Sequence, residues 1–190
     1  MKSSPNSVSV LPFKLETRLE QNIVAVPEWL EGVVWGKPRP GHPEGKVVSH
    51  IRDVLNNIDR FFSNSSDRSR LRLVALIHDP FKYKENRTET EARKRSHGYL
   101  AWDFAERYIN DKGVLKVIEL HDEAYKAWQL LAQPGKQAVA EQRATELMTQ
   151  LDYHLDLFMR FYLCDHRTGD KSVTHYEWFK KVMEKWEVYR

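Results

Sequence analysis

Residues 71–79 read Leu-Arg-Leu-Val-Ala-Leu-Ile-His-Asp, an apolar run that ends in a histidine and an aspartate. At the helical period its apolar side chains fall on nearly every side, and Pro80 then interrupts the run because proline has no backbone N–H to donate. A helix that is apolar on all sides is buried among other helices. We therefore predict a central bundle helix over residues 71–77, followed by His78 and Asp79.

An amphipathic helix is predicted upstream, over residues 47–62. Its apolar positions recur at spacings of three and four residues and are Val47, Ile51, Val54, Ile58 and Phe61. The polar stretch 64–67 ends this helix. Residues 37–45 contain three prolines and cannot be helical throughout. A short helix is expected before them, over residues 14–21.

Two helices are predicted after the central one. Thr88 and Glu91 have the spacing of a capping box, and the helix that follows them is expected to stop at Gly113. The next helix is expected over residues 114 to about 131.

Two more helices complete the predicted bundle. After a turn at Pro134-Gly135 a long helix is expected to run toward Asp165, and Thr174 with Glu177 indicates a final capped helix. The sequence contains no internal repeat and no convincing alternation of strand type. It therefore predicts an all-α bundle of about six to eight helices.

Length and composition indicate one globular domain. The 190 residues suit a single hydrophobic core, and 41% hydrophobic residues are enough to offset the entropy of ordering the chain. Residues 1–12 are rich in serine and proline and are expected to form a flexible N-terminal arm. We assign residues 13–190 to one domain.

Charge, cysteine content and hydropathy narrow the partners and the compartment. A net charge of +3 provides no strong field for nucleic acid or an anionic membrane, and the longest apolar stretch is too short to cross a bilayer. Cys164 is the only cysteine, so no intrachain disulfide can form, and the first residues lack the pattern of a secretory signal. We therefore expect a cytoplasmic protein without a membrane or nucleic-acid partner.

Several ionisable residues occupy positions that the helical period assigns to the core. His50, for example, lies three residues after Val47 and four residues before Val54. The ionisable residues predicted to face the interior are His50, His78, Asp79, His97, His121 and Asp165. A single inward histidine is usually an ordinary core residue, but several helices that each place such a side chain on the buried side favour a shared site.

Buried carboxylates at Asp79 and Asp165 require nearby positive charge, because an unpaired carboxylate is costly to remove from water. A metal ion supplies that charge. Imidazole nitrogens together with carboxylate oxygens suit manganese, iron, nickel, cobalt or zinc, and they suit magnesium less well. The six side chains are enough for one or two divalent ions.

The ordered pattern of these residues resembles the HD-domain superfamily of metal-dependent phosphohydrolases, which is named for an adjacent histidine and aspartate. The resemblance covers approximately residues 42–170. The segments 41–50 (Gly-His-Pro-Glu-Gly-Lys-Val-Val-Ser-His), 73–79 and 97–101 (His-Gly-Tyr-Leu-Ala) are similar to segments of HD domains fused to tRNA nucleotidyltransferases. The resemblance implies an HD-like helical bundle that binds metal.

The resemblance also implies roles for individual residues. The ligands of one ion would be His50, His78, Asp79 and Asp165, and a second ion would add His97 and His121. Asp79 would bridge the two ions as a catalytic residue, with Lys82 beside it. The family pattern His-Asp-x-Gly-Lys is present here with Phe81 in place of the glycine.

The function implied is hydrolysis of a nucleotide or other small phosphate ester by water that the metal activates. Lys82, Arg167 and Lys171 are candidate contacts for the substrate phosphate. Two alternatives stay open: a mixed-valent diiron oxygenase with the HD fold, and a regulatory module that holds metal without catalysis. The N-terminal segment and the last helix, which match nothing in the family, are candidate surfaces for a homodimer.

Overall fold

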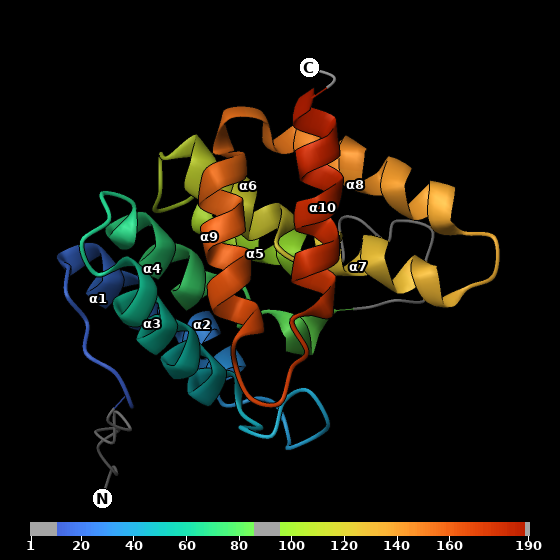
Figure 1. Ribbon diagram of the computed structural model, residues 1–190. Helices are drawn as coiled ribbons and strands as arrows, with labels where there is room; N and C mark the ends of the chain where they lie inside the picture. The colour runs from blue at the N-terminus through green and yellow to red at the C-terminus, as the bar shows by residue number, and fades with distance from the viewer. Residues whose placement is uncertain (1–10, 86–95, 189–190) are drawn as a thin grey trace, which may run out of the picture.

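The computed structural model describes residues 11–85 and 96–188. Within these ranges the regular structure is helical, so the predicted all-α class is confirmed (Figure 1). The α-helices are α1 (Arg18–Val24), α2 (Pro27–Val33), α3 (Val47–Phe62), α4 (Arg68–Ile77), α5 (His97–Ala105), α6 (Lys112–Leu120), α7 (Glu123–Gln129), α8 (Gln137–Leu151), α9 (Leu155–His166) and α10 (Thr174–Val188). Short 3-10 turns follow α4, α7 and α8 at Lys82–Lys84, Leu130–Ala132 and Asp152–His154.

Helix α4 is the central element of the bundle, as the apolar run predicts. It packs against α3, α6 and α9, and its side chains from Leu71 to Ile77 are buried apart from Leu73, which is partly buried. The indole Nε1 of Trp29 in α2 donates a hydrogen bond of 2.7 Å to the carbonyl of Leu76. This bond satisfies one of the carbonyls that a helix leaves unpaired at its C-terminal end.

The N-terminal helices differ from the prediction. The short helix expected over residues 14–21 is α1, which begins at Arg18 because Thr17 and Glu20 form a capping box there. Helix α2 was not expected. Residues 1–10 of the expected arm lie outside the described residues, whereas Leu11 is partly buried against the core.

Two long helices expected from the sequence are each broken in the structure. The helix expected over residues 114–131 is α6 and α7, which are separated at His121 and Asp122. The helix expected to lead to Asp165 is α8 and α9, and Asp152 between them has a φ of 48°, which a continuous helix cannot contain. After these breaks, α7 packs against α8 and α10, and α9 packs against α3, α4 and α6.

The expected helix boundaries around α5 and α10 are also shifted. Helix α5 begins at His97 with Ser96 as its cap and ends at Ala105, so it does not continue to Gly113. The capping box expected at residues 88–91 lies outside the described residues. Thr174 is the first residue of α10. In the described part of the chain, no helix combines the length and hydropathy needed to span a membrane.

Candidate metal centre

All six predicted ligand residues converge in the interior. They come from α3 (His50), the end of α4 (His78 and Asp79), the start of α5 (His97), the end of α6 (His121) and the end of α9 (Asp165). Each of them is at most 5% exposed. The structure therefore brings together side chains that are up to 115 positions apart in the sequence.

His50, His78 and Asp165 form one group of donor atoms. The Nε2 atom of His50 lies 2.8 Å from Asp165 Oδ1 and 3.3 Å from His78 Nε2, and His78 Nε2 lies 4.0 Å from Asp165 Oδ1. Ligand atoms that share an ion at about 2.1 Å lie roughly 3 Å from one another. These spacings can therefore accommodate a divalent ion after small side-chain shifts.

Asp79, His97 and His121 form a second group. The Nε2 atoms of His97 and His121 are 3.0 Å apart, and they lie 3.8 and 3.5 Å from Asp79 Oδ1. Gly98 allows this approach, because a Cβ at that position would lie 2.4 Å from the carbonyl oxygen of Glu119 in α6. The start of α5 is thus held directly against the end of α6.

The Asp79 carboxylate joins the two groups. Its Oδ2 atom lies 3.6 Å from His50 Nε2 and 3.5 Å from His78 Nε2, while Oδ1 faces His97 and His121. Oδ1 is buried and has no hydrogen-bond partner among the described residues. A buried carboxylate oxygen without a partner is costly, and a cation at this point would satisfy it.

The four imidazoles share an orientation that suits metal ligands. The Nδ1 atoms of His78 and His121 lie 3.0 and 2.8 Å from the carbonyl oxygens three residues earlier, which can only accept hydrogen bonds. These Nδ1 atoms therefore donate, and each Nε2 is left to face the donor cluster. In the same way, Nδ1 of His50 and of His97 lies 3.3 Å from a glutamate oxygen. Such partners are typical of histidines that bind metal.

The charges of the imidazoles depend on their carboxylate neighbours. Burial lowers the pKa of His78 to about 3, so its ring is neutral at physiological pH, as a metal ligand must be. Burial would also lower the pKa of His97, but the nearby Asp122 carboxylate raises it to about 9. An ion that binds His97 near neutral pH must therefore displace a proton.

Two of the three candidate phosphate contacts lie beside this cluster. Lys82 Nζ is 2.7 Å from Asp79 Oδ2, and Lys171 Nζ is 3.2 Å from Asp165 Oδ1. Both lysine side chains are partly exposed, so they lie at the rim. The structure does not bring Arg167 to the cluster, because its guanidinium lies over the ring of Phe61 near the far end of α3.

Three acidic residues near the cluster were not predicted from the sequence. Glu44 and Glu85 are the carboxylates that face Nδ1 of His50 and of His97. Asp122 lies 3.2 Å from His97 Nε2 through Oδ2 and 3.7 Å from His121 Nε2 through Oδ1. Glu44 and Glu85 lie in loops, where no helical period marks an inward side. Asp122 had one signal, because it directly follows a predicted ligand.

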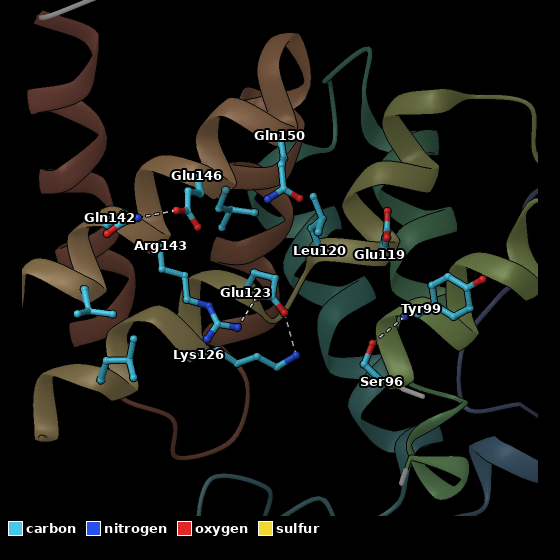
Figure 2. Close-up of a pocket in the computed structure, with 13 residues that line it drawn as sticks. Ser96, Tyr99, Glu119, Leu120, Glu123, Lys126, Gln142, Arg143, Glu146 and Gln150 are labelled. Carbon is cyan, nitrogen blue, oxygen red and sulfur yellow. Dashed lines mark hydrogen bonds and ion pairs between the residues drawn. The ribbon is translucent and has the colours of Figure 1, made fainter. Parts of the chain in front are cut away.

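A separate cavity of about 700 Å³ lies among α5, α6, α7 and α8 (Figure 2). Its described lining includes none of the six predicted ligands. Glu123 on its wall accepts hydrogen bonds from Lys126 and Arg143 at 3.0 and 2.7 Å, so these charges are paired with one another. This cavity is therefore separate from the histidine and aspartate cluster.

No protein-family model, curated protein or solved structure matches the chain. The resemblance to HD domains therefore stays a prediction from the sequence. What the structure shows is an all-helical protein with two buried groups of histidine and aspartate that could hold metal ions.

Proposed function

We propose that this protein is a metal-dependent phosphohydrolase that acts on a nucleotide or other small phosphate ester. The observation that carries the proposal is the position of Asp79, whose two oxygens face two separate imidazole pairs while Lys82 contacts it at 2.7 Å. The order of the ligands along the chain, which resembles the HD superfamily, supports the same reaction.

The reaction needs a nucleophile and compensation for phosphoryl charge. A pair of divalent ions in this centre would lower the pKa of water and neutralise phosphoryl oxygens. The chain supplies imidazole nitrogens for such ions, with the His78 ring already neutral, and a buried setting in which charges interact strongly. With both carboxylates satisfied by ions, the ammonium groups of Lys82 and Lys171 become available to the substrate phosphate.

The test combines metal analysis with release of phosphate. The full chain is purified, loaded in turn with Mn²⁺, Fe²⁺ and Ni²⁺, and incubated with a panel of nucleotides and phosphomonoesters. We expect phosphate release that Asp79→Asn abolishes, because this change removes the shared charge and keeps the side-chain shape. Asp156→Asn is the control, since Asp156 is 71% exposed on α9.

Other outcomes would contradict the proposal. Full activity in Asp79→Asn would remove this centre from the mechanism. Tightly bound metal without turnover of any phosphate ester would favour a module that holds metal without catalysis. Consumption of oxygen by the iron-loaded protein, with a mixed-valent spin signal, would favour an oxygenase.

A further inference from the structure

The chain contains the dipeptide His-Asp twice, at 78–79 and at 121–122, and both copies follow the last residue of a helix. His78 ends α4 with φ and ψ of −57° and −38°, and His121 ends α6 with −55° and −32°. The Nδ1 atom of each histidine bonds the carbonyl three residues earlier, at 3.0 and 2.8 Å. The two pairs thus repeat one local structure on two helices that pack together.

The aspartates also hold similar places relative to their own histidines. An oxygen of Asp79 lies 3.5 Å from His78 Nε2, and an oxygen of Asp122 lies 3.7 Å from His121 Nε2. The other oxygen of each carboxylate faces a histidine from elsewhere in the chain, which for Asp122 is His97 at 3.2 Å. Asp122 therefore stands to the second donor group much as Asp79 stands to the first.

Helix capping does not explain where the carboxylate of Asp122 lies. Asp122 is the N-cap residue of α7, and an N-cap aspartate normally accepts a hydrogen bond from a backbone N–H of the first turn. Among the described residues Asp122 makes no such bond. Its carboxylate is turned instead toward the two Nε2 atoms that face the second group, and its side chain is 26% exposed.

We propose that Asp122 is a ligand of the second metal ion, together with Asp79, His97 and His121. This inference rests on the metal centre of the proposed function. The donor sets then match, because each ion has two imidazoles and two carboxylates, with Asp79 shared. Three carboxylates also offset most of the positive charge of two divalent ions. Matched sets of this kind suit two ions of the same element, such as manganese or iron.

The experiment compares metal binding in the full chain and in variants of Asp122. Asp122→Asn removes the charge and keeps the shape, and Asp122→Ser is a second variant that also retains a good helix-capping side chain. Glu123→Gln is the matched control, because the neighbouring Glu123 pairs with Lys126 and Arg143 (Figure 2). Mn²⁺ is titrated into metal-free protein, and bound metal is counted by elemental analysis. Circular dichroism checks that each variant is folded.

We expect two ions per chain in the unmodified protein and in Glu123→Gln. In both Asp122 variants the second ion should bind at least about tenfold more weakly, with the first ion retained. The visible absorption spectrum of the second Co²⁺ ion bound per chain should also differ between the Asp122 variants and the unmodified protein. A structural change away from the ion would leave that spectrum unchanged. Two ions bound with unchanged affinity and spectrum in folded Asp122 variants would overturn the assignment and leave the proposed centre intact. Absence of bound metal from the unmodified protein would instead overturn the centre itself.

Discussion

Phe81 occupies the position where the HD pattern has glycine, and the structure explains why a large side chain is accepted there. The backbone of Phe81 has a φ of −97°, a value open to any residue, so glycine is not required. Its ring is 1% exposed and packs on Phe104 at 4.9 Å between centroids. The substitution therefore adds to the core beside Asp79.

Phe81→Ala should lower the free energy of unfolding by about 3–5 kcal/mol, because it leaves a cavity in the core. Urea denaturation of the metal-free protein measures this change. Tyr153→Ala is the control, since Tyr153 is 89% exposed and its loss should cost within about 0.5 kcal/mol. A cost at Phe81 as small as that of the control would contradict the role of Phe81 in the core.

At the scale of helices, close approaches at glycine set the geometry of the centre. A Cβ at Gly32 in α2 would lie 1.7 Å from the carbonyl oxygen of Pro80, so α2 holds the residue that follows Asp79. Gly98 performs the same function for α5 against α6. The spacing of the donor atoms therefore depends on glycines at the two contacts, where a larger residue would push the segments apart.

Gly98→Ala should move the start of α5 away from α6 and separate His97 from His121, whose Nε2 atoms are 3.0 Å apart. We expect loss of the second ion, retention of the first, and a decrease of about 1–3 kcal/mol in the free energy of unfolding. Elemental analysis and urea denaturation measure the two effects. Asp103→Ala, at an exposed position of the same helix, should change neither. Two tightly bound ions in Gly98→Ala would show that the contact is not needed.

The helical period of the apolar residues predicts which side of a helix is buried, but not where a helix breaks. It gives the bounds of α3 and the inward positions of His50, His97, His121 and Asp165, because apolar spacing reports which side of a helix is buried. The helical period cannot locate the helix breaks, because the apolar spacing continues across them. Glu44 is missed because it lies in a loop, where no helical period applies, and Asp122 is missed because it lies at a helix break that the apolar spacing does not mark.

For the molecule as a whole, metal binding and stability should be coupled through the protonation of His97. Burial would lower its pKa from the ordinary value of 6.5, but the Asp122 and Glu85 carboxylates favour the charged ring and raise the pKa to about 9. The stability that this charge provides is fully present below pH 6.5 and is lost as the pH rises through 9. Metal needs the neutral ring, so metal affinity should rise over the same interval.

The difference in melting temperature between metal-loaded and EDTA-treated protein should therefore increase from pH 6.5 to pH 9. Differential scanning calorimetry at several pH values measures it, with the metal concentration held constant. In His97→Gln, which cannot bind this proton, the increase should be much smaller than in the unmodified chain. An equal increase in both proteins would mean that another group controls the coupling. A melting-temperature difference that stays constant from pH 6.5 to pH 9 would show that metal does not compete with the His97 proton.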